Sequence, residues 1–259
     1  MDLGLKNKRV VITGASRGIG REISDKFFEE GSKLTLIARN KDQLEKLINS
    51  YGGEKNGHNY IAVDLNQKKI PTKVANDIIK TNEKIDVVVH NLGGGIGSSD
   101  IFSELENWKD VWMFNVGIAI ELNKVFAPHM VEKKWGRIVH ISSSNSITGG
   151  TMSDGEAPAP AYSCAKAYLN MYSKILSREL AKHNIVVSAV MPGILKVEGK
   201  YWDRLEKANP SLIKNYLKNH HAIRRFGKPE EIAPFVIMLA SKHASFASGA
   251  NINIDGGYL

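Results

Sequence analysis

Seven short apolar runs alternate with longer segments of helical periodicity, and this alternation constrains the fold more than any other feature of the chain. The runs are rich in β-branched residues and apolar at successive positions, as in parallel strands buried on both faces. We predict strands at residues 9–13, 34–38, 60–63, 86–90, 137–141, 185–190 and 251–254. We predict helices near residues 18–30, 41–49, 72–80, 104–133, 162–182 and 229–241. This order predicts a doubly wound α/β fold, with helices covering both faces of a parallel sheet.

The chain is expected to form one domain over residues 1–259, because neither a repeat nor a flexible linker divides it. A ligand should then bind beyond the carboxyl ends of the strands. The single cysteine excludes an internal disulfide framework and a zinc site built from several cysteines, so we expect no metal. The first residues lack the apolar run of a signal peptide or membrane span, which favours a cytoplasmic protein without a membrane partner.

The formal net charge of +8 permits nucleic-acid binding but does not require it. The charge forms no basic tail or long run of like residues, so we expect no nucleic-acid partner. Between Lys196 and Arg225, however, eight basic residues stand against three acidic ones. This region is either a solvated helix face or a surface that meets an anionic cofactor or substrate.

A glycine-rich loop joins the first predicted strand to the first predicted helix. Gly14 allows a tight turn, while Gly18 and Gly20 allow close approach of a pyrophosphate and close packing of helix on strand. The helix N-terminus offers free N–H groups and a partial positive charge to phosphates. The spacing is G-x-x-x-G-x-G, and the strand–helix context favours a dinucleotide site over a simple turn.

The end of the second predicted strand indicates which dinucleotide binds. An acidic residue there would bind the ribose hydroxyls of NAD, whereas an arginine suits the 2′-phosphate of NADP. This chain has Ala38 followed by Arg39, and Arg17 lies in the glycine loop. A guanidinium can form two charge-assisted hydrogen bonds to phosphate, so we predict that NADP(H) is preferred over NAD(H).

Polar residues gather where the predicted sheet should bind its ligand. A serine cluster at 142–144 follows the fifth strand, Tyr162 and Lys166 lie four residues apart, and Asn91 and Asn115 stand in "HNLGGG" and "MFNVG". With "TGASRGIG", "MPG" and "NIDGGY", these motifs cover essentially the whole chain in order, and the sequence resembles the short-chain dehydrogenase/reductase family, especially members similar to 3-oxoacyl-carrier-protein reductases. The resemblance implies a single Rossmann-like domain with a seven-stranded parallel sheet, assembled as a homotetramer or homodimer.

The resemblance also implies a catalytic set of Asn115, Ser143, Tyr162 and Lys166. Tyr162 would be the general acid, and Lys166, one helical turn away, would lower the pKa of its phenol and hold the nicotinamide ribose. Ser143 would hydrogen-bond the substrate carbonyl, with Ser142 and Ser144 as rivals, and Asn115 would hold a water of a proton relay. Cys164 should face another side of this helix as a small packing residue.

The motifs and the resemblance together place a cofactor against residues of several loops. These are Gly14, Ser16, Arg17, Gly18, Ile19, Gly20, Arg39, Asp64, Leu65, Asn91, Gly93, Tyr162, Lys166, Pro192, Gly193 and Ile194. Asp64 would contact the adenine, and residues 192–194 would lie beside the nicotinamide. Leu92 and Val197 depart from the family pattern, which commonly has alanine and threonine there.

The substrate lid is expected at residues 195–221, with the aromatic residues Tyr201, Trp202 and Tyr216. Its basic surplus predicts an anionic substrate, for which replacing Lys200, Arg204 and Lys207 with glutamine should raise KM. A longer segment than usual separates Ser143 from Tyr162, and we expect residues 149–160 to loop out near the substrate. The predicted function is reduction of a small-molecule carbonyl with NADPH. The alternatives are specifically a 3-oxoacyl-carrier-protein reductase or a non-catalytic NADP-binding sensor or scaffold.

Overall fold

A computed structural model describes residues 1–82, 84–98, 100–150 and 160–258. Seven strands form one parallel sheet in the order β3-β2-β1-β4-β5-β6-β7. The strands are β1 (Arg9–Thr13), β2 (Lys33–Ala38), β3 (Asn59–Ala62), β4 (Val87–His90), β5 (Gly136–Ile141), β6 (Ile185–Pro192) and β7 (Asn251–Ile254). The prediction of a doubly wound parallel sheet is therefore confirmed, and each strand lies within two residues of its predicted bounds.

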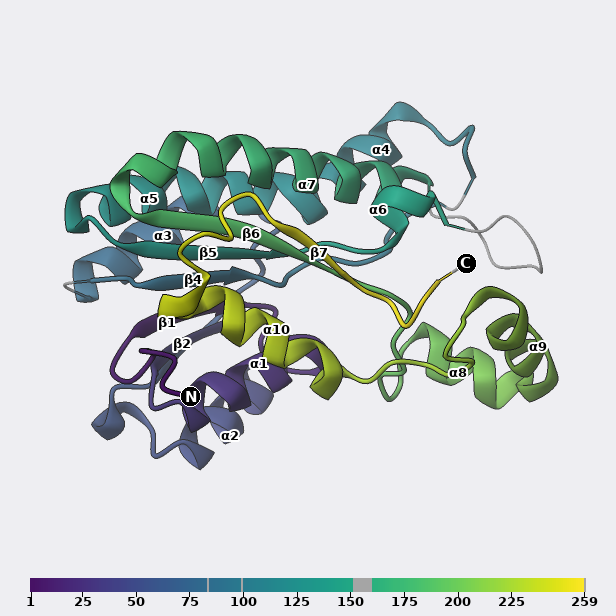
Figure 1. Cartoon of the computed structure of the whole chain (residues 1–259), viewed down its shortest axis with the longest axis horizontal. Helices are drawn as coiled ribbons and strands as arrows, with labels where there is room; N and C mark the ends of the chain where they lie inside the picture. The colour runs from purple at the N-terminus through teal and green to yellow at the C-terminus, as the bar shows by residue number, and fades with distance from the viewer. Residues whose placement is uncertain (83, 99, 151–159, 259) are drawn as a thin grey trace.

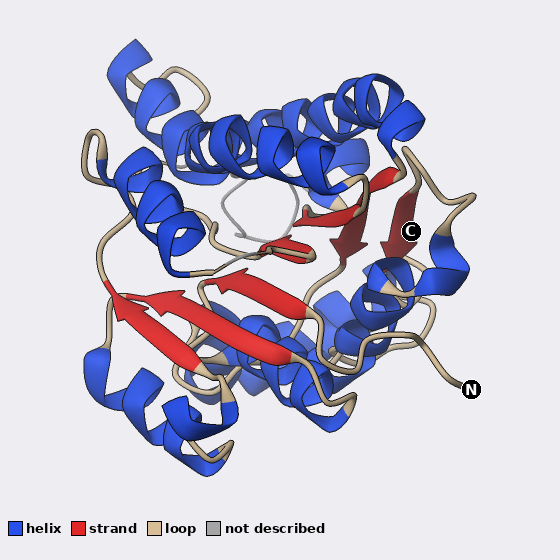
Figure 2. Ribbon diagram, turned by 90° about the vertical axis from the view of Figure 1, so that its left-hand side faces the viewer, coloured by secondary structure: helices blue, strands red, loops and turns tan. Residues whose placement is uncertain are grey.

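Helices cover both faces of this sheet, as Figure 2 shows. In Figure 1, α3, α5 and α7 lie on one face and α1, α2 and α10 on the other. These six helices are α1 (Gly18–Glu29), α2 (Lys41–Ser50), α3 (Ile70–Thr81), α5 (Ile118–Lys133), α7 (Pro160–Leu180) and α10 (Pro229–Ala240). Each face carries its own cluster of buried apolar side chains, which explains why the strands are apolar on both sides.

The predicted helix at 104–133 is interrupted, which the sequence pattern did not indicate. It consists of α4 (Leu105–Trp112), a π-helical turn at Met113–Gly117 and α5. Such single π turns are rare inside helices and are often found at functional sites. This one contains Asn115, so it sets the position of a predicted catalytic residue.

Three further helices lie at the end of the molecule where β5 and β6 finish. The short α6 (Asn145–Thr148) follows β5, while α8 (Tyr201–Ala208) and α9 (Pro210–His220) lie between β6 and α10. Figure 1 shows α8 and α9 side by side, projecting beyond the sheet. No helix among the described residues is both long and apolar enough to cross a membrane.

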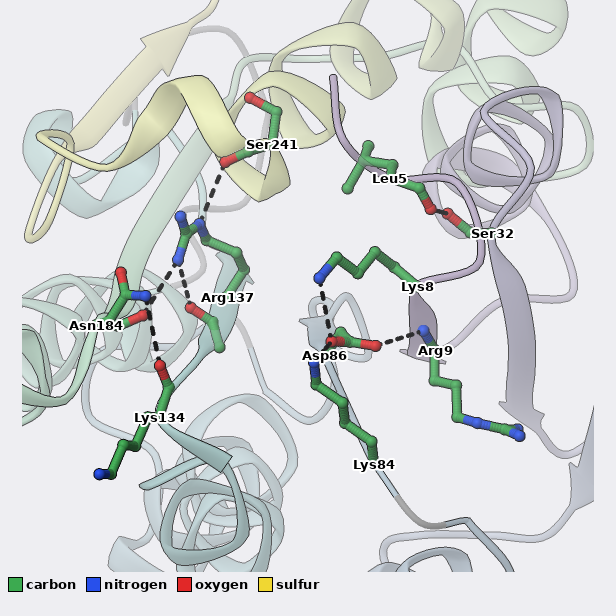
Figure 3. Close-up of polar contacts among 11 residues, drawn as sticks. Leu5, Lys8, Arg9, Ser32, Lys84, Asp86, Lys134, Arg137, Asn184 and Ser241 are labelled. Atoms are coloured by element: carbon green, nitrogen blue, oxygen red, sulfur yellow. Dashed lines mark hydrogen bonds and ion pairs between the residues drawn. The ribbon is translucent and has the colours of Figure 1, made fainter. Parts of the chain in front are cut away.

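The amino ends of the strands are held together by a group of polar contacts (Figure 3). Asp86, which precedes β4, is almost fully buried and accepts a hydrogen bond from the Arg9 main-chain N–H at 2.9 Å. Its carboxylate also pairs with Lys84 at 2.9 Å and with Lys8 at 3.4 Å. These contacts satisfy a buried charge and tie β4 to the start of β1.

Arg137, at the start of β5, is fully buried and lies in the same region (Figure 3). Its guanidinium donates to the main-chain carbonyls of Gly136 at 2.8 Å, Ser241 at 3.2 Å and Asn184 at 3.3 Å. One side chain thus links β5 to the end of α10 and the start of β6. The polar groups at this end brace the sheet, and the opposite, carboxyl end carries the loops that can form a ligand site.

Candidate active site

A cleft of about 800 Å³ lies at the carboxyl ends of the strands, where the fold predicts ligand binding. Most of the residues predicted to contact a cofactor line it. These are Gly14, Ser16, Arg17, Gly18, Ile19, Arg39, Asp64, Leu65, Asn91, Gly93, Tyr162, Lys166, Pro192 and Gly193. The structure therefore brings together loops that are separated by as many as 179 residues, from Gly14 to Gly193.

The glycine loop is shaped by close main-chain packing. Gly14 has φ +66°, a left-handed conformation that favours glycine, and a Cβ there would lie 2.9 Å from the Asn91 amide. A Cβ on Gly20 would lie only 2.3 Å from the Gly14 carbonyl oxygen. The Asn91 amide donates to the carbonyls of Thr13 and Gly14 at 3.1 and 3.0 Å, so it fastens this loop to β4. Gly20 is buried in this packing and does not line the cleft.

One end of the cleft is basic. Arg17 and Arg39, both exposed, line it as predicted, and Lys200 from the segment before α8 joins them. Asn40 also lines this end, and its side chain caps α2 by accepting the Gln43 main-chain N–H at 2.9 Å. The sequence grouped Lys200 with a substrate lid, and no local motif indicated that it reaches the same cleft end as the two arginines.

The opposite end of the cleft contains Ser143 and Tyr162. The Tyr162 hydroxyl hydrogen-bonds to the Ser143 side chain, while burial raises the pKa of the phenol and this bond opposes the rise. Ser142 differs, because its hydroxyl donates to the Lys166 main-chain carbonyl at 3.2 Å. Ser144 is buried, and its main-chain N–H donates to the Pro192 carbonyl at 2.9 Å. Of the three serines, Ser143 is the one that meets Tyr162.

Lys166 lies deeper than the sequence indicated. It is 2% exposed, its ammonium donates to the Ile141 carbonyl at 2.8 Å, and its Nζ lies 5.6 Å from the centre of the Tyr162 ring. Burial lowers the pKa of Lys166 to about 7. In this structure burial raises the pKa of Tyr162 and the contact with Ser143 opposes the rise, so the lowering expected from Lys166 is not seen here.

Asn115 stands behind the cleft and fixes the loop after β4. Its side-chain oxygen accepts the Gly94 N–H at 2.9 Å, and its amide donates to the carbonyls of Gly94 and Val111 at 3.1 and 3.0 Å. A Cβ on Gly93 would lie 2.7 Å from the Asn115 oxygen and 2.9 Å from the Lys166 ammonium. Asn115 thus positions the glycines that separate it from the cleft.

Besides Gly20, two residues depart from their predicted positions. Cys164 is exposed, so the expectation that it is a small packing residue is wrong. Its position two residues before Lys166 turns it away from the buried face of α7. Ile194 does not line the cleft but packs against the apolar cluster of the lid, and Leu195 lines the cleft in its place.

Two histidines form a buried polar network next to the site. The Asn123 side chain joins the two rings: its Oδ1 lies 2.8 Å from His90 Nε2, and its Nδ2 lies 3.2 Å from His140 Nε2. The other ring nitrogen of His140, Nδ1, lies 2.8 Å from the Ser173 hydroxyl. Burial lowers the pKa of His90 to about 4 and that of His140 well below its ordinary range. Both rings are therefore neutral near pH 7, and they support the ends of β4 and β5 without adding charge.

The lid segment forms its own small core. Tyr216 is buried with Ile213 and Phe226, and Trp202 stacks on its ring at 5.5 Å. Two of its lysines form ion pairs with acidic residues of α8: Lys207 with Asp203 at 2.8 Å and Lys196 with Glu206 at 2.5 Å. Aromatic side chains thus join α8 to α9, and part of the basic surplus is neutralised within the segment. Most of the predicted loop at 149–160 lies outside the described residues.

Comparisons with known proteins agree with this geometry. Residues 8–205 match the family model described as short chain dehydrogenase. The chain is 31% identical over 99% of both chains to a 3-oxoacyl-(acyl-carrier-protein) reductase of Aquifex aeolicus. It is 28% identical to a 7alpha-hydroxysteroid dehydrogenase of Paraclostridium sordellii, covering 98% of this chain and 92% of the relative.

A solved structure is similar over the whole chain. The L-sorbose reductase of Gluconobacter frateurii, complexed with NADPH and L-sorbose, has a TM-score of 0.88 and 31% identity, covering 100% of this chain and 99% of that one. The family match spans most of the sequence, and the fold and the polar residues of the cleft agree with it. The chain therefore belongs to the short-chain dehydrogenase family and is an NAD(P)-dependent oxidoreductase.

Proposed function

We propose that the protein is an NADPH-dependent reductase that interconverts a carbonyl and a secondary alcohol. The observation that carries the proposal is that Tyr162, Ser143 and Lys166 meet at one end of a cleft whose other end bears Arg17 and Arg39. The first end has the groups for transferring a proton, and the second has the charge for binding an anionic nucleotide. The meeting of these three of the four catalytic candidates argues against a non-catalytic sensor or scaffold.

The cleft fits a nicotinamide dinucleotide in shape and in charge. Gly14 and Gly18 have φ +66° and +56°, conformations that favour glycine. Because glycine has no side chain, the main chain of this loop can come close to the phosphates of the cofactor. Gly93 leaves the main chain close to Asn115 and Lys166 with no space for a Cβ. When bound, the cofactor supplies or accepts the hydride, and the protein orients it and manages the proton.

Tyr162 is the proposed proton donor for carbonyl reduction. Because burial raises the pKa of its phenol, the hydroxyl stays protonated at neutral pH, which is the state that an acid requires. The Ser143 hydroxyl, already bonded to Tyr162, is placed to donate a hydrogen bond to the same substrate oxygen. The two hydroxyls thus define where the carbonyl binds.

Lys166 and Asn115 are proposed to support Tyr162 from behind. The bond from Lys166 to the Ile141 carbonyl aims its side chain from α7 toward the end of β5, beside the Tyr162 ring. A pKa of about 7 lets the lysine gain or lose a proton near neutral pH, which suits a relay that reprotonates the tyrosine. Asn115 is hydrogen-bonded to the main chain of Gly94 and thereby fixes the glycine loop that lies beside Lys166.

The preference for NADP(H) is proposed from Arg17 and Arg39, with Ala38 where an NAD-binding acid would stand. Replacing Arg39 with alanine is expected to raise the Kd for NADPH about 10- to 100-fold, because charge-assisted hydrogen bonds to the 2′-phosphate are lost. The Kd for NADH should change less than about twofold. Fluorescence titration measures both, with Arg178→Ala on the exposed side of α7 as the control. Equal losses for the two cofactors would contradict the assignment.

The substrate class is proposed as a ketone, with a 3-oxoacyl thioester on a carrier protein as the specific alternative. The Aquifex aeolicus reductase and the L-sorbose reductase are each 31% identical to this chain, so identity alone does not separate an acyl substrate from a sugar. An anionic substrate is still proposed from the basic lid, but Lys207 and Lys196 are engaged by Asp203 and Glu206. An NADPH-oxidation screen over β-ketoacyl thioesters, keto sugars and simple ketones separates these classes.

We also propose a homo-oligomer, either a dimer or a tetramer. The outer face of α7 exposes Tyr168, Met171 and Ile175, which are spaced to lie on one side of the helix. Trp112 of α4 packs edge-on against Tyr168 and extends this apolar surface. Replacing Met171 and Ile175 with lysine is expected to convert the assembly to monomers or reduce its size, as measured by sedimentation velocity. An unchanged sedimentation coefficient would place the interface elsewhere.

A further inference from the structure

The segment between β6 and α8 crosses the glycine loop, which brings the lid next to the cofactor site. A Cβ built on Gly18 would lie 3.4 Å from a methyl group of Val197, so the two segments almost touch. A second cavity of about 530 Å³ lies between this segment and α2, lined by Arg17, Gln43 and Gly199 among others. Lys200, the next residue, lines the main cleft.

Lys200 is held in this position by a braced turn. Asp203 is only 3% exposed, and its carboxylate accepts the Gly199 main-chain N–H at 2.9 Å and the Lys207 ammonium at 2.8 Å. The Lys200 N–H donates to the Val197 carbonyl at 3.0 Å. The turn therefore fixes the direction in which the chain enters α8, and Lys200 leaves it at the basic end of the cleft.

The cations at this end repel one another. Burial lowers the pKa of Lys200, and the nearby charges of Arg17, Arg39 and Arg204 lower it further. Lys200, Arg17 and Arg39 come from three separate loops and line the same end of the cleft. Among the described residues, no carboxylate forms an ion pair with Lys200. A bound dianion would therefore stabilise this cluster of positive charges. The 2′-phosphate of NADP(H) is such a dianion, and it would enter this end of the cleft.

We propose that Lys200 is a third cation for the 2′-phosphate of NADP(H), so that binding of this phosphate holds α8 against the glycine loop and links cofactor choice to closure of the lid. This inference rests on the NADP(H) preference proposed above. Arg17 and Arg39 belong to the cofactor-binding half of the domain, whereas Lys200 lies in the lid, directly before α8. The phosphate would bridge these two parts, and NAD(H), which lacks it, would leave them repelling each other.

The binding test compares ligands that differ only by the 2′-phosphate. Calorimetry would give Kd values for 2′,5′-ADP against 5′-AMP, and for NADP⁺ against NAD⁺. Lys200→Met is expected to weaken binding of 2′,5′-ADP and NADP⁺ about tenfold, while 5′-AMP and NAD⁺ change less than about twofold. Lys218→Met is the matched control, because it removes the same charge from an exposed position on α9 of the same lid.

A second test asks whether the 2′-phosphate holds α8 against the glycine loop, and it needs no enzyme turnover. Hydrogen exchange of the α8 amides at residues 201–208 is expected to slow when 2′,5′-ADP saturates the wild-type protein, and to slow much less with 5′-AMP. In Lys200→Met at saturating 2′,5′-ADP, α8 should exchange as in the free protein. Equal protection in the variant and the wild type would overturn the link between the phosphate and the lid.

The outcomes separate this inference from the proposed function. If the wild type binds NADP⁺ and NAD⁺ equally, the proposed cofactor preference is wrong, and the role of Lys200 is wrong with it. If the wild type prefers NADP⁺ and Arg39→Ala loses that preference while Lys200→Met keeps it, only the role of Lys200 is wrong. Loss of the preference in both variants, with Lys218→Met unchanged, supports the inference.

Discussion

Replacing Tyr162 with phenylalanine is expected to lower kcat about 10³-fold on any confirmed ketone substrate. The change removes the hydroxyl that bonds to Ser143 and leaves the partly buried ring in place on α7. General acid catalysis by a positioned side chain contributes about 10²- to 10⁴-fold, so its loss should appear mainly in kcat. The Kd for NADPH should change far less, because the glycine loop and the arginines are untouched.

The same helix offers a matched control for this substitution. Tyr168 lies away from the cleft on the outer face of α7, within the proposed oligomer interface, and Tyr168→Phe removes an identical hydroxyl while keeping the ring that packs on Trp112. Steady-state kinetics with NADPH and circular dichroism should show a near-normal kcat for Tyr168→Phe and a native spectrum for both variants. A Tyr162→Phe enzyme with full activity would show that another group delivers the proton.

Replacing Lys166 with methionine is expected to stabilise the protein while lowering its activity by at least 10²-fold. Burial lowers the pKa of this lysine from 10.5 to about 7, so folding at neutral pH disfavours its charged form at a cost of roughly 4 kcal/mol. Methionine has a similar length and no charge, but it leaves the Ile141 carbonyl without its donor, which costs about 1–3 kcal/mol. The net gain should be about 2 kcal/mol at pH 7.

The stability gained by Lys166→Met depends on pH, because the pKa of this lysine differs between the folded and the unfolded chain. Between pH 7 and 10.5 the unfolded chain binds more protons at this lysine than the folded chain, so wild-type stability rises as the pH rises. Below pH 7 Lys166 is protonated in both the folded and the unfolded chain, so the folded protein bears the full cost of burying its charge. The advantage of the variant should therefore be largest at and below neutral pH and should shrink toward pH 10.

Urea unfolding without added nucleotide, at pH 6, 7 and 9, measures this difference. Lys174→Met, at an exposed position on the same helix, should change neither stability nor activity appreciably. Lower stability of Lys166→Met at pH 6 would mean that the charged lysine is well solvated or paired in the folded protein. A gain in stability with unchanged activity would remove Lys166 from the proposed relay.

The sheet and the six main helices were predictable because local sequence carries their apolar patterns. Runs such as residues 9–13 and 185–190 are β-branched and apolar throughout, and only a strand covered on both faces buries such a run. The π turn at Met113–Gly117 carries no comparable pattern, since it differs from a continuous helix by one residue in a turn. The helices α8 and α9 were likewise missed, because their apolar residues pack mainly on one another.

The types of residue in the active site were predictable, and their arrangement was predictable only in part. The family resemblance named Ser143 among three adjacent serines after β5, and the turn into α6 explains why Ser143 meets Tyr162 while Ser142 bonds to Lys166. The depth of Lys166 was also hidden, and this depth lowers the pKa of the lysine itself to about 7. The direction in which a side chain points and the depth at which it is buried depend on packing between elements that lie far apart in the chain. Spacing along the sequence therefore does not reveal them.

The fold class, the family and the candidate catalytic residues could be inferred from the chain alone, because apolar strand runs, glycine spacing and the Tyr162–Lys166 separation are local properties. The folded arrangement was needed to show which groups share an environment. It moved Lys200 from a supposed substrate surface to the end of the cleft that holds Arg17 and Arg39. Charges interact through space, and the distance between two side chains in a folded chain is set by how the loops cross, which no local pattern records.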